Sequence, residues 1–213
     1  MVSIVPTITA ETPDEYARQI DQIKPFVNRI HVDVADGVFV PRKLVGLSQV
    51  YDIDGAEFDL HLMVSHPESE LENVISLQPD LVIIHFEADG NRDELIRELR
   101  NCDIRVGLAI NVDTTIQQVS DLLPNFDHLL IFTGGHLGYF SGQFQAECLD
   151  KIAQARAINP NLEIAVDGGV DQESAQLAID AGANVLNCGS FIHDAKDPEM
   201  AYVALAAIAE SAS

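Results

Sequence analysis

The sequence has few basic residues. Its 213 residues include 12 Lys and Arg against 34 Asp and Glu, which gives a formal net charge of −22 at pH 7. Proteins that bind nucleic acids or anionic membranes use clustered Lys and Arg side chains to neutralise phosphate groups. We therefore expect no nucleic-acid partner and no membrane partner. The acidic residues are spread along the chain, which is typical of a strongly hydrated surface; adaptation to a salty cytoplasm is the alternative explanation.

Cysteines and long apolar segments are also scarce. Cys102, Cys148 and Cys188 lack the spacing of a disulfide framework or a zinc site, and an odd number favours buried thiols in a reducing compartment. The longest apolar run, 201–209, is too short to span a bilayer. The N-terminal segment lacks the pattern of a signal peptide. These features predict a cytoplasmic protein.

Short apolar runs alternate with longer amphipathic stretches along the whole chain. The pattern predicts strands at 3–8, 28–34, 58–64, 81–86, 105–110, 127–133, 162–167 and 184–188, with helices at 13–23, 44–51, 66–77, 91–101, 114–122, 146–158, 171–181 and 197–210. Strand–helix pairs in this number predict an α/β fold, a (β/α)₈ TIM barrel in which residues 1–213 form a single compact domain. An open doubly wound sheet is the alternative, but the first strand is not followed by the Gly-x-Gly-x-x-Gly signature of dinucleotide binding.

Polar side chains interrupt three of these apolar runs. His31 and Asp33 lie two residues apart and so share one face of a strand, His61 lies in the next run, and Asp167 ends the seventh. Such side chains are costly inside a sheet unless they are paired or ligated. Barrels of this kind carry their chemistry at the carboxyl ends of the strands. Two imidazoles and two carboxylates there predict a site for a divalent transition metal.

Two neighbouring polar residues have more than one interpretation. His85 either orients a metal ligand or packs as a core histidine, and the sequence favours neither interpretation over the other. Asp59 alternates with His61, so it either faces the same interior or has a supporting or helix-capping role.

Glycines follow the seventh and eighth runs. Gly168 and Gly169 close one, and Gly189 with Ser190 closes the other. Glycines let backbone N–H groups approach an anion, and these barrels often bind phosphate after their last two strands, so we expect a phosphate site here. The segment 133–143 contains four glycines and two aromatic residues. This composition fits a mobile lid that excludes water from the site, and an ordinary flexible loop is the alternative.

The chain resembles the ribulose-phosphate 3-epimerase family in motifs that occur in order along nearly its whole length. These motifs are Val5-Pro6-Thr7-Ile8, the segment 31–41 that reads His-Val-Asp-Val-Ala-Asp-Gly-Val-Phe-Val-Pro, His61-Leu62-Met63-Val64 with Pro67-Glu68, His85-Phe86-Glu87-Ala88, the segment 106–111, Val166-Asp167-Gly168-Gly169 and Gly189-Ser190. The resemblance implies a (β/α)₈ barrel with one divalent metal ion, and Zn²⁺, Fe²⁺ and Mn²⁺ are all compatible with the ligands.

The resemblance also implies roles for individual residues. The metal ligands would be His31, Asp33, His61 and Asp167, and the two aspartates would exchange protons with C3 of a ketose phosphate through a cis-enediolate that the metal stabilises. The substrate would contact Thr7, His61, Met63, Gly134, Gly135, Gly142, Gly168, Gly169, Gly189 and Ser190. This describes an isomerase of carbohydrate metabolism that converts D-ribulose 5-phosphate to D-xylulose 5-phosphate in the pentose phosphate route, and we expect a homo-oligomer.

Several positions depart from the family pattern. Ala35 and Phe132 stand where the family has methionine, Arg42 replaces a different polar residue, and the loop 135–143 is longer and lacks the family's proline. These changes leave the proton-transfer residues intact and bear on which sugar is bound. A hexulose phosphate such as allulose 6-phosphate is therefore an alternative substrate. A non-catalytic sugar-phosphate-binding protein and an aldolase-like barrel are further alternatives, although no lysine falls on a predicted strand, as a Schiff base requires.

Overall fold

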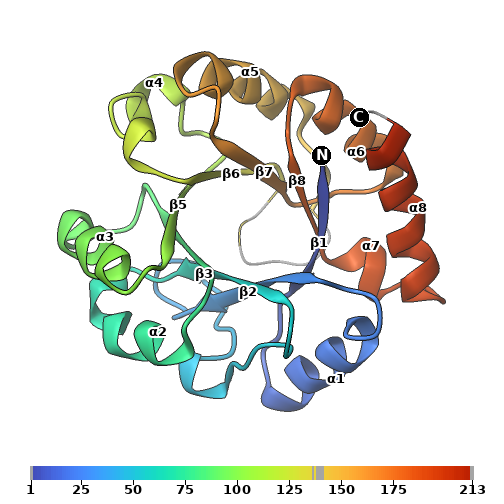
Figure 1. Cartoon of the computed structure of the whole chain (residues 1–213), viewed down its shortest axis with the longest axis horizontal. Helices are drawn as coiled ribbons and strands as arrows, with labels where there is room; N and C mark the ends of the chain where they lie inside the picture. The colour runs from blue at the N-terminus through green and yellow to red at the C-terminus, as the bar shows by residue number, and fades with distance from the viewer. Residues whose placement is uncertain (1, 136, 138–141, 212–213) are drawn as a thin grey trace.

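The computed structural model describes residues 2–135, 137 and 142–211, and in them eight parallel strands close into a barrel (Figure 1). The strands are β1 (Ser3–Ile8), β2 (Arg29–Ala35), β3 (Glu57–Met63), β4 (Leu81–His85), β5 (Arg105–Ile110), β6 (His128–Phe132), β7 (Glu163–Asp167) and β8 (Val185–Cys188). They pair in chain order, and β8 pairs with β1, so each strand has a neighbour on both sides. The barrel predicted from the sequence is confirmed.

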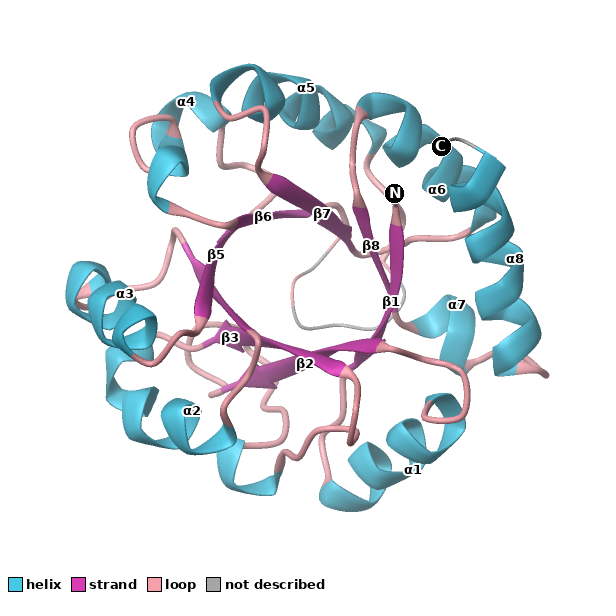
Figure 2. Cartoon of the chain, in the orientation of Figure 1, coloured by secondary structure: helices cyan, strands magenta, loops and turns pink. Residues whose placement is uncertain are grey.

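Helices surround the barrel and cover its outer face (Figure 2). They are α1 (Pro13–Ile23), α2 (Leu71–Leu77), α3 (Arg92–Asn101), α4 (Ile116–Val119), α5 (Leu149–Ile158), α6 (Gln172–Ala181), α7 (Ser190–His193) and α8 (Pro198–Ser211), with 3₁₀ helices at Leu47–Gln49, Pro67–Glu70, Leu123–Asn125 and Ala146–Cys148. Thr12 caps α1, since its side chain accepts the N–H of Glu15, and Pro13 takes the first position. Within the described ranges no helix has the length and hydropathy to cross a membrane.

The helix predicted at 44–51 is wrong. This segment contains only the 3₁₀ helix Leu47–Gln49. The N–H of Val45 donates to the carbonyl of Ala10 at 2.9 Å, so the backbone is bonded to the loop after β1 and not within a helix. Gly46 further disfavours helix formation at this point. As a result β2 reaches β3 without an α-helix, whereas both α7 and α8 follow β8.

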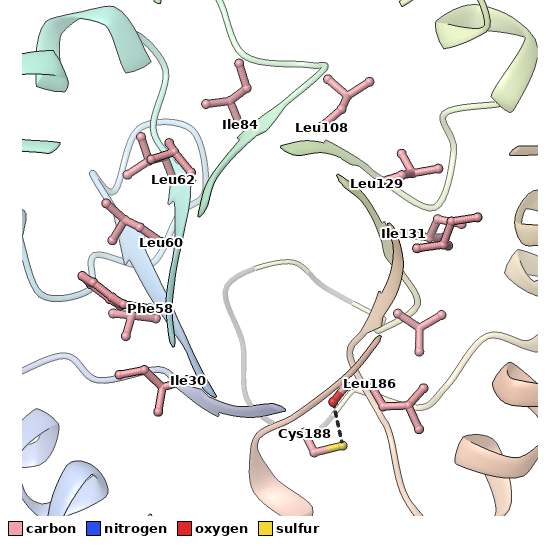
Figure 3. Close-up of a cluster of buried hydrophobic side chains, with 14 of the residues drawn as sticks. Ile30, Phe58, Leu60, Leu62, Ile84, Leu108, Leu129, Ile131, Leu186 and Cys188 are labelled. Carbon is pink, nitrogen blue, oxygen red and sulfur yellow. Dashed lines mark hydrogen bonds between the residues drawn. The ribbon is translucent and has the colours of Figure 1, made fainter. Parts of the chain in front are cut away.

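Side chains on the outer face of the strands pack under the helices (Figure 3). In β2 the outward residues are Ile30, Val32 and Val34, all of them in the main apolar core. Because side chains alternate along a strand, His31 and Asp33 point into the barrel. The near-continuous apolar appearance of such a run therefore conceals a polar inner face.

The barrel interior contains an apolar middle and a charged N-terminal end. The apolar cluster includes Val5, Ile83, Leu130, Ala165 and Val185. At the N-terminal end, Arg29 donates to both Glu163 oxygens at 2.9 and 3.0 Å and to Asp59 at 2.8 Å. Arg105 and His128 also donate to Glu163. Asp59 thus faces the interior, but at the opposite end from the carboxyl ends of the strands.

Glu163 is the centre of this charged cluster, and its carboxylate should stabilise the barrel in a pH-dependent way. Burial raises its pKa, but hydrogen bonds from His128 and Arg29 outweigh burial and hold the pKa well below the usual range. With a depressed folded pKa, the stabilisation is present above the unfolded pKa and is lost as the pH falls toward the folded value. We expect Glu163→Gln to lower the free energy of unfolding by about 3 kcal/mol at pH 7.

Chemical denaturation at pH 7 and at about pH 3.5 measures this effect, and the difference between wild type and variant should shrink at the lower pH. Glu199→Gln, at an exposed site on α8, is the control and should change stability by less than about 0.5 kcal/mol. An equal loss for Glu163→Gln at both pH values would show that its carboxylate charge is not what stabilises the cluster.

Candidate metal centre

Four buried side chains from three strands converge at the C-terminal half of the barrel interior. They are His31 and Asp33 on β2, His61 on β3 and Asp167 on β7, and one ligand atom of each lies within 4.8 Å of all the others. Asp33 Oδ1 lies 2.8 Å from His61 Nδ1 and 3.3 Å from His31 Nε2. His31 Nε2 lies 3.9 Å from Asp167 Oδ2. The structure thus brings together all four residues that the sequence predicted as metal ligands.

A chain of hydrogen bonds determines which nitrogen of His61 carries the proton. Burial raises the pKa of Glu87, but hydrogen bonds with His85 and the N–H of Asn111 outweigh it and lower the pKa to about 2. The Glu87 carboxylate therefore accepts the proton of His85 Nδ1 at 3.2 Å, and His85 Nε2 accepts from His61 Nε2 at 2.9 Å. This arrangement leaves His61 Nδ1 as an acceptor that faces Asp33 Oδ1, and two acceptor atoms 2.8 Å apart need a cation between them.

Asp33 is held through its other oxygen. Thr9 Oγ1 donates to Asp33 Oδ2 at 2.7 Å, which leaves Oδ1 facing both histidines. Burial raises the pKa of the Asp33 carboxyl, but the contacts with His31 and His61 outweigh burial and keep the pKa below its usual range. Burial lowers the pKa of His31 to about 4, so this imidazole is neutral at pH 7.

Asp167 has the opposite pKa direction. Burial and the nearby charge of Asp33 raise its pKa well above the usual range. Its backbone carbonyl accepts the N–H of Thr133 at 2.7 Å, which fixes the end of β7 against the end of β6. Two carboxylates and two histidines buried together need a positive charge, because burying uncompensated anions is costly.

These residues fit a divalent metal ion. His31 Nε2 is buried without a hydrogen-bond partner, and His61 Nδ1 faces Asp33 with no proton to donate. Two imidazole nitrogens and two carboxylate oxygens are ligands that suit Zn²⁺, Fe²⁺ and Mn²⁺. The donor set therefore supports a metal site while leaving the choice among these ions open.

A pocket opens at this end of the barrel, and Asp33, His61 and Asp167 form part of its wall. The other lining residues are Thr7, Thr9, Met63, Phe132, Gly134, Leu137, Gly142, Gly168, Gly169, Val170, Asn187, Gly189 and Ser190. Of the substrate contacts predicted from the sequence, Gly135 alone is absent from this lining, and it is exposed. The others line the same pocket as Asp33, His61 and Asp167.

The glycines after β6 and β7 allow two loops to touch. Gly168 and Gly169 have φ angles of +105° and +73°. A Cβ atom on Gly168 would lie 2.5 Å from the nitrogen of Gly134, and one on Gly169 would lie 2.5 Å from the carbonyl oxygen of Gly142. Glycine is therefore needed at both positions for conformation and for space. The centre of the predicted lid, residues 136 and 138–141, lies outside the described residues.

Sequence reasoning missed the supporting roles of Thr9, Glu87 and Asn187. Thr9 lies two residues after Thr7, and Glu87 two residues after His85, so the two-residue repeat that grouped the ligands could also have found these partners. Asn187 is a polar residue in the short apolar strand β8, which is the same signal as at His31. His85 is buried and its Nε2 lies 2.9 Å from His61 Nε2, a contact that would allow it to orient this candidate metal ligand.

The fold and the site define a barrel enzyme with a candidate metal centre, and comparison with known proteins identifies its family. The model of the ribulose-phosphate 3-epimerase family matches residues 3–193. The chain is 32% identical to the ribulose-phosphate 3-epimerase of Chlamydia pneumoniae over 175 residues, 78% of this chain and 76% of the relative. It is 28% identical to that of Bacillus subtilis over 210 residues, 94% and 96% of the two chains.

This protein belongs to the ribulose-phosphate 3-epimerase family and is an isomerase of the carbohydrate epimerase class. Solved structures with lower identity share the fold. A 3-hexulose-6-phosphate synthase from Salmonella typhimurium matches with a TM-score of 0.75 and 18% identity over 100% of both chains. A 3-keto-L-gulonate-6-phosphate decarboxylase from Vibrio cholerae matches with a TM-score of 0.76 and 12% identity, over 100% of this chain and 99% of that one.

His61 offers a direct test of the metal centre. We expect His61→Ala to lose the bound metal and most of the activity, because it removes one ligand and the hydrogen-bond chain that orients it. Elemental analysis after reconstitution measures metal content. His66→Ala is the matched control, since His66 is exposed in the loop after β3 and should leave the metal content unchanged. A fully active, metal-free wild-type preparation would contradict the metal assignment.

Proposed function

We propose that this protein interconverts D-ribulose 5-phosphate and D-xylulose 5-phosphate, two ketoses that differ in configuration at C3. The observation that carries the proposal is the placement of Asp33 and Asp167. They come from different strands, both line the pocket, and one oxygen of each lies within 4.8 Å of the other. Inversion at one carbon needs a proton acceptor and a proton donor around the same atom, and this pair supplies both.

The residues that fit a metal would hold it on the floor of the pocket through His31, Asp33, His61 and Asp167. When bound, a divalent ion supplies positive charge that polarises the ketone of the sugar and acidifies the neighbouring carbon. The hydrogen-bond chain from Glu87 through His85 keeps His61 Nδ1 free to act as a ligand. The choice among Zn²⁺, Fe²⁺ and Mn²⁺ is settled by activity after reconstitution with each ion.

In one direction, Asp33 takes the proton from C3, and the electron pair of that C–H bond stays on the sugar as an enediolate. Asp167 then returns a proton to C3 from the other face, which inverts the configuration. In the reverse direction the two carboxylates exchange roles. Their pKa values move in opposite directions, Asp33 downward and Asp167 upward, as expected for a base and an acid that share one site.

Backbone groups would hold the phosphate. The described lining of the pocket contains no Lys or Arg, although the substrate would be an anion. Gly168, Gly169, Gly189 and Ser190 stand at the ends of β7 and β8, where backbone N–H groups can approach phosphate oxygens closely. The hydroxyl of Thr7 is buried in the pocket wall without a hydrogen-bond partner, so it can bind an oxygen of the sugar.

The alternatives have less support. A Schiff-base aldolase needs a lysine in the pocket. All four lysines lie outside the strands and outside the pocket lining: Lys24, Lys43, Lys151 and Lys196. A non-catalytic binding protein has no need for a complete pair of carboxylates beside two ligating histidines. A homo-oligomer and a cytoplasmic location are further parts of this proposal, and sedimentation velocity tests the first.

The two aspartates should both be essential. We expect Asp33→Asn and Asp167→Asn each to abolish epimerisation, because each removes one of the two proton-transfer groups. Turnover of D-ribulose 5-phosphate and incorporation of deuterium at C3 in deuterated water measure the effect. Asp180→Asn, on the exposed face of α6, is the control and should keep wild-type turnover. Near-wild-type turnover in either active-site variant would refute the two-base assignment.

Phe132 should influence which ketose phosphate is used. Its side chain lines the pocket, whereas Ala35 packs against Met63, Val40 and Leu44 behind the lining. We expect Phe132→Met to change the ratio of kcat/KM between five-carbon and six-carbon ketose phosphates, because a flexible side chain replaces a rigid ring in the wall. Steady-state kinetics on both substrates provide the measurement.

Ile131→Met is the matched control, since Ile131 lies on the same strand but faces the helices (Figure 3). A swap between similar apolar side chains there should cost less than about 1.5 kcal/mol of stability and leave the substrate ratio unchanged. If Phe132→Met leaves the ratio as in wild type, Phe132 does not set specificity.

A further inference from the structure

Asn187 is a buried polar residue that the mechanism above does not use. It lies on β8 beside Asp167 of β7 and Val5 of β1 in the strand register, with 2% of its surface exposed. Its side chain lines the pocket, and its Nδ2 lies 3.2 Å from His31 Nδ1. This contact joins the final strand of the barrel to a candidate metal ligand.

The present orientation of the amide leaves polar atoms without partners. With Nδ2 facing His31, Nδ1 of the ring must accept, so the ring proton lies on Nε2. Yet Nε2 faces Asp33 and Asp167 without a hydrogen bond of suitable geometry, and Asn187 Oδ1 also has no partner. The hydrogen bond that the structure gives this amide is the contact with His31, so the position of the His31 proton decides which orientation is favoured. A turn of the amide by 180° exchanges its oxygen and nitrogen positions.

We propose that Asn187 is a positioning residue for the metal: its Oδ1 accepts the Nδ1–H of His31 and keeps Nε2 unprotonated toward Asp33 and Asp167. The inference rests on the proposed metal centre. Each histidine then has a hydrogen-bond partner on the ring nitrogen that faces away from the ligand cluster. For His61 this partner is His85, and for His31 it is Asn187. Such partners fix the tautomer and orientation of a ligating imidazole.

The first test uses the wild-type protein loaded with Zn²⁺. Long-range ¹H–¹⁵N NMR correlations distinguish the two ring nitrogens of each histidine, and the resonances of His31 can be assigned by their loss in His31→Gln. We expect the His31 proton on Nδ1 and the metal-bound signature on Nε2. A proton on Nε2, or metal on Nδ1, would overturn the proposal without any substitution at Asn187.

The second test compares two variants by competition for Zn²⁺ with a chromophoric chelator. Asn187→Leu has nearly the same shape but no acceptor, and we expect it to bind Zn²⁺ about 10- to 100-fold more weakly. Asn187→Asp keeps an acceptor and cannot donate, so it should retain or exceed wild-type affinity. If Asn187→Asp loses as much affinity as Asn187→Leu, the assigned orientation is wrong.

Wild-type affinity in Asn187→Leu would refute the positioning role while leaving the metal centre intact. Failure of the wild-type protein itself to bind Zn²⁺ would refute the metal centre and this inference with it. Circular dichroism and thermal unfolding of each variant show whether it is folded, and if Asn187→Leu does not fold, the NMR result on the wild-type protein decides.

Discussion

The register between β2 and β3 is the constraint on which the site depends. It sets Asp33 directly beside His61, and His31 beside Asp59, on the inner face of the barrel. Side chains alternate along a strand, so a shift of one residue would turn His61 outward into the apolar layer under the helices. The outward residues Leu60 and Leu62 of β3 oppose that shift, because it would bring them into the barrel. The packing of the outer core therefore fixes the chemistry of the inner face.

The barrel interior contains a cluster of polar side chains at each end, and the two clusters differ in how their charge is balanced. At the N-terminal end, Arg29 and Arg105 neutralise Glu163 and Asp59 within the protein. At the C-terminal end, two carboxylates lie beside two histidines, and His31 at least is neutral at pH 7. The first cluster therefore pairs its carboxylates with arginines of the same chain, whereas the second needs a cation. The apolar middle of the barrel lies between them.

Sequence reasoning predicted the parts of this protein that depend on local pattern. The strands lie within two residues of their predicted bounds, and the residues that carry the two-residue repeat, such as His31 and Asp33, share one face as expected. The helix at 44–51 failed because Val45 bonds to a carbonyl more than thirty residues earlier in the chain. Contacts between distant strands, such as Arg29 with Glu163 or Asn187 with His31, follow from closure of the barrel and leave no trace in a local window.

Strands and loops contribute differently to function here. The candidate metal ligands, which include both carboxylates of the proposed proton transfer, lie on strands, where backbone pairing on both sides fixes them. The pocket walls above them come largely from loops, and the loops after β6 and β7 are joined where Gly134 meets Gly168. Thr133 strengthens that junction, since its hydroxyl donates to the carbonyl groups of Asp167 and Gly168 at 3.0 and 2.8 Å. A substitution that alters the β6 loop should therefore displace Gly168, which belongs to the proposed phosphate site, while strand pairing holds the carboxylates in place.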